Sequence, residues 1–328
     1  MEKNYLYFSD SFGGCMNLAR DEWFLDHVRP GELILHFYIN GNAVIIGKNQ
    51  NPMTECDLAK MKEDGVTLVR RISGGGAVYH DRGNLNFSFI AGKDRFDKDR
   101  QHRLIAEAVQ SVGVPCGFSG RNDLLADGKK FSGNAYCSRG EGRLHHGTLL
   151  ISSDLTKLAR YLTVDPRKIA SKGVASVRSR VCNLNEFRPG LTVREMKTVI
   201  PEAFRRTYGG FEEYPFRAED RAEIRNVYLK KHVSRAWRYG AAPPFDFAID
   251  ERLPFGGVRI LLRLKEGRVV SSATYTDAND DTLAERIDRL LAGAPFEKGA
   301  IVRALLRGRT EETDALAGRV GELDLPEN

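Results

Sequence analysis

Three consecutive glycines, Gly74 to Gly76, follow the arginine pair Arg70-Arg71. Glycine leaves the backbone amides open and tolerates positive φ angles, so a run of this kind can form a nest that binds anions. An arginine beside it adds a fork of donors suited to phosphate or carboxylate. We interpret residues 70–79 as a loop that holds a negatively charged group against the backbone; an ordinary tight turn is the alternative.

This loop does not fit the common nucleotide-binding motifs. No Gly-Lys-Ser/Thr follows the glycines, so it is not a Walker A motif. A Gly-x-Gly-x-x-Gly motif should open a helix. Here Leu85, Phe87 and Phe89 alternate with polar residues, which predicts a half-buried strand.

A second candidate segment runs from Gly120 to Ala135. Asp127-Gly128 is a turn signal, so the segment should form a hairpin with Asp123 near the start of one strand and Lys130 and Ser132 on the return strand. A carboxylate such as Asp123 is suited to hold Mg²⁺, and Lys130 is suited to neutralise a phosphate or a substrate carboxylate. For a lysine beside a turn, solvated surface is the alternative.

A third candidate segment, Lys172 to Arg180, mixes flexible, hydroxyl and cationic residues. We interpret it as a mobile loop that closes over an anionic ligand; a solvated basic loop is the alternative. The residues of interest in it are Lys172, Gly173, Val174, Ser176 and Arg178. His145 and His146 are neighbours on a predicted strand and so point to opposite faces, which argues against a metal site there.

Together the three segments meet the demands of an enzyme that activates a carboxylic acid. A carboxylate does not react with amines until it carries a good leaving group, which ATP can supply as an adenylate with release of pyrophosphate. The glycine-loop amides, Arg71, Asp123 and Lys130 could hold the triphosphate and Mg²⁺ electrostatically. The sequence has no obvious Ser-His or Cys-His motif, and this chemistry needs no protein nucleophile.

The composition is that of an ordinary water-soluble protein. Of its 328 residues 41% are hydrophobic and 29% are charged. No apolar run approaches the roughly 18 residues of a membrane span, and the N-terminus lacks the apolar core of a signal peptide. We therefore expect a cytoplasmic protein without a membrane partner. The five cysteines are odd in number and lack Cys-x-x-Cys spacing, which argues against a zinc site or a disulfide framework.

The net charge of +6 is unevenly placed. Residues 246–328 contain 12 Lys and Arg against 16 Asp and Glu and so carry −4, which leaves +10 for residues 1–245. A basic unit of this kind favours an acidic partner or substrate. A nucleic-acid-binding module is one rival interpretation, but basic patches interleaved with aromatic residues are missing, and we expect no nucleic-acid partner.

The elements that must position these residues indicate an α+β fold. Apolar runs at 33–39 and 43–46, joined by Asn40-Gly41-Asn42, predict a hairpin. Residues 66–72 predict the strand that delivers the glycine loop, and residues 104–112 and 154–162 predict helices. Strand pairs outnumber βαβ alternations, so we expect a mixed, largely antiparallel sheet with helices packed on it.

A domain boundary is expected near residue 245. Pro243-Pro244 excludes a helix and favours an extended linker. Strand patterns at 258–262 and 267–270 and a helix pattern at 283–291 follow. We therefore expect a catalytic domain at 1–245 and a small α+β accessory domain at 246–328.

On these motifs the chain resembles the lipoate–protein ligase A family. The matching segments, in chain order, are Val44 to Pro52, Arg70 to Asp81, Gly120 to Asp123, Lys130 to Gly133, His145 to Leu150, Lys172 to Arg180, Asp250 to Arg252 and Gly256 to Val258. They extend over nearly the whole chain, and several independent motifs in the same order make the resemblance specific.

The resemblance implies a biotin/lipoate-ligase fold, related to class II aminoacyl-tRNA synthetases, with a C-terminal accessory domain. It implies that lipoate and ATP give lipoyl-AMP and that a lysine of an acceptor lipoyl domain then takes the lipoyl group. The acceptors it implies are the E2 subunits of 2-oxoacid dehydrogenases and the H protein of glycine cleavage, with lipoate or octanoate as the small substrate. We expect a monomer.

The resemblance also assigns roles to residues. Arg71 and the segment Gly74, Gly75, Gly76, Ala77, Val78 and Tyr79 would contact the nucleotide. Lys130 would be the catalytic residue, contacting both the carboxyl end of lipoate and the phosphate, and residues 168–180 would be the adenylate-binding loop. Asp123 as a Mg²⁺ ligand is an extension of our own.

Two enzymatic rivals remain on the same fold. One is a transferase of octanoyl or lipoyl groups that uses a cysteine thiolate and no ATP, for which Cys137 and Cys182 are the candidates. The other is a transferase that uses lipoyl-AMP but cannot make it.

Overall fold

The computed structural model describes residues 2–119, 123–162, 181–240, 245–323 and 325–326. Its largest sheet has eight strands within these residues, in the order β11-β1-β2-β6-β10-β9-β8-β7. The strands are β1 (Lys3–Phe8), β2 (Glu32–Tyr38), β6 (Asn84–Gly92), β7 (Gly117–Ser119), β8 (Asp123–Ala126), β9 (Lys129–Arg139), β10 (Gly142–Leu150) and β11 (Glu212–Glu213). β1 pairs in parallel with β2 and β11, and the other neighbours are antiparallel, which confirms the predicted mixed sheet.

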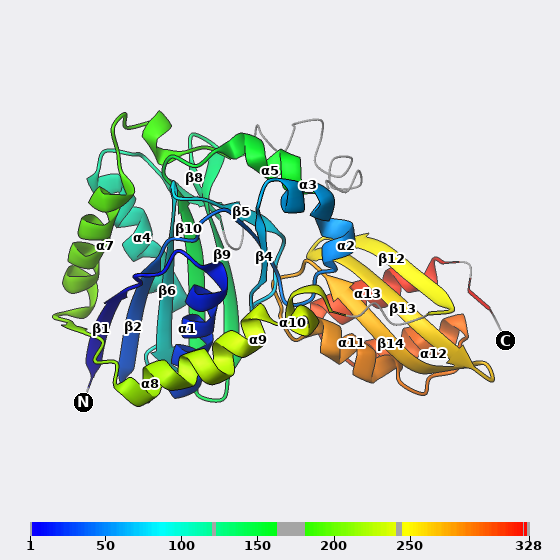
Figure 1. Ribbon diagram of the computed structural model, residues 1–328. Helices are drawn as coiled ribbons and strands as arrows, with labels where there is room; N and C mark the ends of the chain where they lie inside the picture. The colour runs from blue at the N-terminus through cyan, green and yellow to red at the C-terminus, as the bar shows by residue number, and fades with distance from the viewer. Residues whose placement is uncertain (1, 120–122, 163–180, 241–244, 324, 327–328) are drawn as a thin grey trace.

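Helices cover both faces of this sheet (Figure 1). Helices α4 (Lys98–Ser111) and α7 (Val193–Tyr208) pack against each other on one face, where Leu33, Leu35 and Phe37 of β2 enter the main core. Helix α1 (Gly14–His27) covers the other face, with Ile34 in its core. Beside α1 lies a segment made of α8 (Ala218–Glu223), a π-helical turn (Ile224–Tyr228), α9 (Leu229–Val233) and α10 (Arg235–Tyr239).

The expectation that residues 85–89 form a half-buried strand is wrong in one respect. These residues lie in β6, and every residue of β6 is buried. The polar members Asn86 and Ser88 are buried: the Ser88 hydroxyl donates to the α1 carboxylate of Asp21 at 2.8 Å, and the Asn86 side chain donates to the Tyr38 carbonyl at 3.2 Å. In β6, the alternation of apolar and polar residues therefore separates an apolar face from a polar face, and both faces are buried.

The hairpin predicted from residues 33–46 is also wrong. β2 pairs with β1 and β6, whereas β3 (Ala43–Ile46) belongs to a second, three-stranded sheet with β4 (Thr67–Arg70) and β5 (Val78–His80). The connecting Asn40 is buried, and its carboxamide bonds to Asn17 (2.9 Å) and His80 (3.0 Å). These bonds hold the connection as a crossing between two sheets. β4 and β5 carry the glycine loop between them.

Other local predictions hold. The turn at Asp127-Gly128 joins β8 to β9, and both residues have positive φ, +48° and +70°, as a tight hairpin turn requires. The helix predicted at 154–162 is α5 (Leu155–Tyr161), with Asp154 as its N-cap. The region between β3 and β4 has two short helices, α2 (Pro52–Glu55) and α3 (Leu58–Glu63).

The C-terminal part has a three-stranded antiparallel sheet and three helices among the described residues. The strands are β12 (Phe247–Leu253), β13 (Gly256–Lys265) and β14 (Arg268–Thr276), and the helices are α11 (Leu283–Leu291), α12 (Lys298–Leu306) and α13 (Glu311–Gly321). These elements share a hydrophobic core drawn from residues 249–325 alone. Across the described residues, none of the helices has the length and apolar character needed to cross a bilayer.

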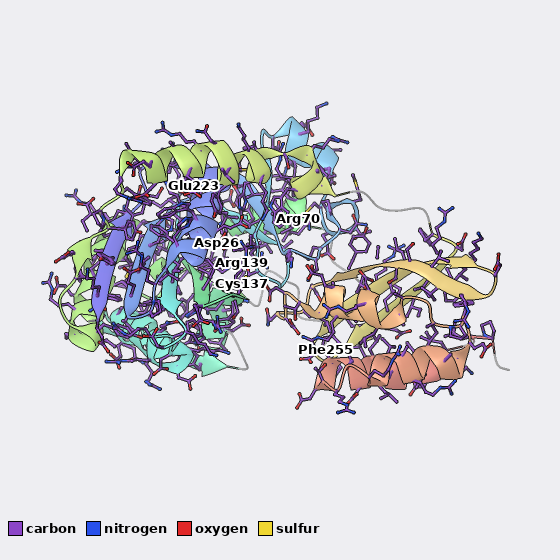
Figure 2. The ribbon with its side chains drawn as sticks, turned by 90° about the horizontal axis from the view of Figure 1, so that it is seen from below. Asp26, Arg70, Cys137, Arg139, Glu223 and Phe255 are labelled. Atoms are coloured by element: carbon purple, nitrogen blue, oxygen red, sulfur yellow. The ribbon has the colours of Figure 1, made fainter. Side chains whose placement is uncertain are left out.

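The end of β14 and the residues that follow it contact the surroundings of the glycine loop. The amide of Thr276 donates to the carbonyl of Asn49 at 2.9 Å, and Lys48 pairs with Glu285 at 2.8 Å. The thiol of Cys137, on β9, lies 3.1 Å from the carboxylate of Asp281. Figure 2 shows Cys137 and Arg70 on the side of the larger unit that faces the C-terminal sheet.

Candidate functional site

A cavity of about 430 Å³ lies where the glycine loop meets β9 and β10. Most of its lining comes from the loop and β5, from the β8–β9 hairpin and from β10; one residue, Asn279, comes from the C-terminal part. The predicted site residues in the lining are Arg71, Gly75, Gly76, Ala77, Val78, Tyr79, Asp123 and Lys130. Two segments distant in sequence are thus brought to one cavity, as the sequence predicted.

Arg71 is buried beneath its own loop. Its guanidinium donates to the carbonyl of Gly74 from Nε (3.0 Å) and Nη2 (2.7 Å), and Nη2 also donates to the carbonyl of Gly76 (2.8 Å). Nε lies 3.2 Å from the Ser73 hydroxyl as well. Burial lowers the pKa of Arg71 to about 10, so the side chain is charged at neutral pH. By gathering the loop carbonyls, this charge fixes the conformation of the glycine loop.

Arg70 points elsewhere. Its Nη1 donates to the carbonyls of Gly47, Lys48 and Gln50 at 2.7–3.1 Å, and its Nε donates to the carbonyl of Trp237 at 2.7 Å. The guanidinium that the sequence suggested as an anion clamp instead ties the β3–α2 connection to α10.

The glycines of the loop serve different purposes. Gly75 has a φ of +92°, and an added Cβ would lie 2.8 Å from Arg71 Nη2. A Cβ on Gly74 would lie 2.6 Å from the carbonyl oxygen of Ala278, and the Gly75 amide donates to that same oxygen at 2.7 Å. At Gly76 a Cβ would meet nothing within 4 Å. Neighbouring protein atoms therefore leave no room for a side chain at Gly74 or Gly75, whereas Gly76 borders open space.

Ala77, Val78 and Tyr79 continue the loop into β5 along the cavity wall. Val78 and Tyr79 pair with β3, which fixes their backbone. The Tyr79 hydroxyl donates to Asn42 at 2.8 Å, and its ring lies 5.5 Å from that of Tyr161. Tyr79 is therefore held at both ends and contributes a fixed aromatic surface.

The predicted β8–β9 hairpin is confirmed, and within it Asp123 and Lys130 form an ion pair. Lys130 Nζ lies 2.7 Å from Asp123 Oδ1, with side chains 38% and 41% exposed. A Cβ on Gly133 would lie 2.9 Å from Lys130 Cε and Nζ, so glycine leaves room for the lysine. Val181 forms a bridge with Lys130, and the amide of Cys182 donates to the Lys130 carbonyl at 3.0 Å. The backbone of Lys130 is anchored, while its side chain stays partly in water.

His146 lines the cavity, although the sequence analysis considered it only as a metal ligand and did not name it as a site residue. The prediction that His145 and His146 face opposite ways is confirmed. His145 stacks on His102 and Phe89 on the α4 side, and His146 lies 2.6 Å from the Ser73 hydroxyl beside the glycine loop. Asn134, Thr148 and Asn279 also line the cavity unpredicted. Thr148 lies in the matched segment His145 to Leu150, which could have identified it, whereas Asn134 and Asn279 lie outside the matched segments.

The remaining predicted site residues cannot be placed. Lys172, Gly173, Val174, Ser176 and Arg178 lie outside the described residues. Their proposed contact with an adenylate stays a prediction.

The two candidate thiols are poorly suited to attack. Cys137 and Cys182 are buried, and neither lines the cavity as the structure describes it. Burial, together with the neighbouring Asp281 carboxylate, raises the pKa of Cys137 well above that of a free thiol. Burial raises the pKa of Cys182 to about 11. Because the thiolate is the nucleophile, neither residue is activated at neutral pH.

Comparisons with known proteins agree with this architecture. The family model described as "Lipoyl protein ligase A/B catalytic domain" matches residues 14–205, and that described as "Bacterial lipoate protein ligase C-terminus" matches residues 242–315. The chain is 36% identical over 326 residues to lipoate-protein ligase A of Bdellovibrio bacteriovorus, covering 97% of this chain and 96% of that protein.

Three solved structures are similar over most of the chain. LipL1 of P. falciparum in complex with lipoate has a TM-score of 0.84 and 25% identity, covering 98% of this chain and all of that one. A bipartite lipoate protein ligase of Thermoplasma acidophilum, studied with its E2 lipoyl domain, has a TM-score of 0.67 and 30% identity, covering 74% and 99%. A lipoate-protein ligase A bound with ATP has a TM-score of 0.63 and 31% identity, covering 73% and 99%.

Proposed function

The chain belongs to the lipoate–protein ligase A family, and from this we propose that it uses ATP to join lipoate to a specific lysine of acceptor lipoyl domains, through lipoyl-AMP. One structural observation links this proposal to particular residues. The open space beside Gly76 and the ammonium of Lys130 border the same cavity, although they come from segments more than 50 positions apart. That cavity is large enough for a small acid and the reacting phosphates.

The first half-reaction makes the mixed anhydride. A carboxylate oxygen of lipoate attacks the α-phosphorus of ATP, the bond between the α-phosphorus and its bridging oxygen breaks, and pyrophosphate leaves. We propose that Lys130 contacts both the carboxylate and the α-phosphate and lowers the charge repulsion between them. Its ion pair with Asp123 is partly exposed, and such pairs contribute only about 0–1 kcal/mol to stability. An anionic substrate can therefore replace Asp123 as the partner of the Lys130 ammonium.

The glycine loop is proposed to receive the nucleotide. Arg71 would act mainly by shaping the loop, because its donors are already bonded to the carbonyls of Gly74 and Gly76. The backbone from Gly74 through Ala77 and Val78 to Tyr79 would contact the phosphates and the nucleoside. The loop at 168–180, with Lys172, Gly173, Val174, Ser176 and Arg178, would complete the enclosure of the adenylate.

Mg²⁺ fits the hairpin as a partner of ATP. Mg²⁺ sites are commonly built from one or two carboxylates and the substrate phosphates, and Asp123 provides one half-exposed carboxylate at the cavity. The ion would neutralise phosphate charge and orient the leaving pyrophosphate. We propose Asp123 as its protein ligand.

The second half-reaction transfers the lipoyl group. The neutral amine of an acceptor lysine attacks the anhydride carbonyl carbon, its bond to the phosphate oxygen breaks, and AMP leaves with that oxygen. We propose lipoyl domains of 2-oxoacid dehydrogenase E2 subunits and the glycine cleavage H protein as acceptors. Residues 1–245 carry +10, which favours an acidic acceptor.

We further propose that the catalytic domain comprises residues 1–245, that the accessory domain comprises residues 246–328, and that the enzyme acts as a monomer in the cytoplasm. In support of the division, the core of β12–β14 and α11–α13 is drawn from residues 249–325 alone. Asn279 and the Ala278 carbonyl bring this accessory part to the edge of the glycine loop.

The experiment that tests the function is pyrophosphate release on mixing the protein with ATP and lipoate, octanoate or biotin. We expect release with lipoate or octanoate and none with biotin. If no acid gave pyrophosphate release but supplied lipoyl-AMP still led to lipoyl transfer, the enzyme would be a transferase that cannot make its own adenylate. ATP-independent acyl transfer that is lost in Cys137→Ala or Cys182→Ala would establish the thiol mechanism instead.

A further inference from the structure

Two consecutive residues of α1 are buried carboxylates that point into different networks. Asp21 accepts hydrogen bonds from His36 Nδ1 (2.8 Å), Tyr38 (3.1 Å) and Ser88 (2.8 Å), and His146 Nδ1 lies 3.4 Å from its Oδ2. Although burial alone would raise the pKa of Asp21, hydrogen bonds from His146 and His36 hold it well below its usual value. Asp21 is therefore a buried negative charge.

Glu22 is buried just as deeply but lies toward α9. It accepts hydrogen bonds from Lys231 (2.6 Å), His232 (2.8 Å) and Arg139 (2.9 Å). Hydrogen bonds from His232 and Lys231 outweigh the effect of burial and lower the pKa of Glu22 to about 2. None of these partners lines the cavity. Asp21 and Glu22 thus lie on the same helix, are both buried and both have a histidine partner. They differ in what that histidine contacts next.

Beyond His146 the Asp21 network reaches the glycine loop. His146 Nε2 lies 2.6 Å from Ser73 Oγ, and Ser73 Oγ lies 3.2 Å from Arg71 Nε. With the Nδ1 proton of His146 directed at Asp21, its Nε2 accepts from the Ser73 hydroxyl, whose oxygen accepts from Arg71. The donors then run in one direction from Arg71 to Asp21, an arrangement in which each bond polarises the next.

The last member of this chain sets the loop conformation. Arg71 holds the carbonyls of Gly74 and Gly76, and the Gly75 amide between them donates to the Ala278 carbonyl, so these contacts together fix the backbone of the loop. All four members of the chain are at least 90% buried: Arg71, Ser73, His146 and Asp21. Arg71 and His146 also line the cavity, whereas Ser73 and Asp21 do not.

We propose that Asp21 is a positioning residue for adenylation: through His146 and Ser73 it orients Arg71 and keeps the glycine loop in the conformation that receives the phosphates of ATP. This inference rests on the proposed function, because it assumes that the loop binds ATP. Asp21 itself does not line the cavity. Its effect is exerted on the loop and not by contact with substrate.

The test compares Asp21→Asn with Glu22→Gln in the full chain. Each substitution keeps the shape and removes a buried charge, so both should lower the melting temperature. We expect Asp21→Asn to raise the KM for ATP in pyrophosphate release at least about tenfold, measured where both variants are folded. Glu22→Gln should leave that KM within about twofold of wild type. An equal KM in the two variants would overturn the proposal, since both residues would then be merely structural.

A second variant keeps the test decisive should Asp21→Asn fail to fold. Ser73→Ala cuts the chain between His146 and Arg71 while Asp21 keeps its other partners. It should raise the KM for ATP by a similar factor, and the Asp21→Asn/Ser73→Ala pair should show less than the product of the single effects. Fully multiplicative effects, or an unchanged KM in Ser73→Ala, would contradict a connected chain.

Failure of the proposed function has its own signature. If wild-type protein releases no pyrophosphate with any acid, the function is wrong. ATP affinity measured by calorimetry then still compares Asp21→Asn, Ser73→Ala and Glu22→Gln. Weaker ATP binding in the first two alone would support the positioning role, and equal binding in all three, or no binding by wild type, would refute it.

Discussion

The two walls of the cavity hold their positive charges in opposite ways. On the glycine-loop wall, Arg71 is 7% exposed and its guanidinium is bonded to its own loop. On the hairpin wall, Lys130 is 38% exposed and pairs with a single, half-exposed carboxylate. One charge is committed to shaping the protein, and the other remains available to a substrate. The comparison suggests that the loop is preorganised, whereas the hairpin supplies the group that changes partners during the reaction.

The largest effect should come from removing the available charge. We expect Lys130→Ala to lower the rate of lipoyl-AMP formation about 10²-fold or more, in line with the loss of one transition-state donor. The measurement is single-turnover pyrophosphate release at saturating ATP and lipoate. Lys129→Ala, next in sequence and exposed to solvent, is the matched control and should stay near the wild-type rate. A near-normal rate in Lys130→Ala would remove Lys130 from the reaction.

The next effect should come from bending the preorganised wall. Gly75→Ala places a Cβ 2.8 Å from Arg71 Nη2 at a φ of +92°, a backbone conformation that costs a non-glycine residue roughly 1–2 kcal/mol. We expect a lower melting temperature and about tenfold weaker ATP binding by calorimetry. Gly76→Ala adds a methyl where nothing lies within 4 Å. It should weaken ATP binding without lowering the melting temperature, and destabilisation by both variants would contradict the distinction.

A smaller effect should separate two roles of Asp123. If it is a Mg²⁺ ligand in the working enzyme, Asp123→Asn should raise the Mg²⁺ concentration needed for half-maximal pyrophosphate release by about threefold to tenfold, since an amide is a weaker ligand than a carboxylate. The control is a titration of ATP at saturating Mg²⁺, where the rate should approach that of wild type. An unchanged Mg²⁺ dependence would leave Asp123 only as the resting partner of Lys130.

The same contrast explains how much could be predicted from sequence. The β8–β9 hairpin was predictable from its two-residue turn, but the Asp123–Lys130 ion pair was not, because the register sets Asp123 opposite Gly133 and Lys130 opposite Leu125. The role of Arg71 in bonding the carbonyls of its own loop could not be predicted, because the sequence does not show whether a guanidinium binds a ligand or the backbone beside it. The mixed sheet followed from the count of strand patterns, but the pairing of β3 did not. Its partner β4 lies more than 20 positions later, and the choice depends on the buried contacts of Asn40.

His146 and Asp21 were missed for a related reason. A histidine on a strand and an aspartate on a helix have no local pattern that joins them, and their link passes through tertiary packing of α1 on the sheet. The polar alternation of β6 was visible in the sequence but was taken to mean exposure to water. A buried carboxylate on the opposing helix is what makes Ser88 compatible with the interior.

The smallest effect is expected for the thiols, which belong to neither wall as reactive groups. Cys182→Ala removes a buried Sγ that lies 3.4 Å from the Lys129 carbonyl, while the backbone amide that bonds Lys130 remains. Cys137→Ser keeps a donor toward Asp281. We expect both variants to retain pyrophosphate release and lipoyl transfer within about twofold of wild type, with a modest loss of stability from the altered packing. Because both thiols have raised pKa values, the transfer rate between pH 7 and 9 should show no rise that disappears in either variant. If the transfer rate rose with pH and this rise were lost in Cys182→Ala, a thiolate next to Lys130 would take part in transfer. The glycine loop and the hairpin would then not account for all the reactive groups of the site.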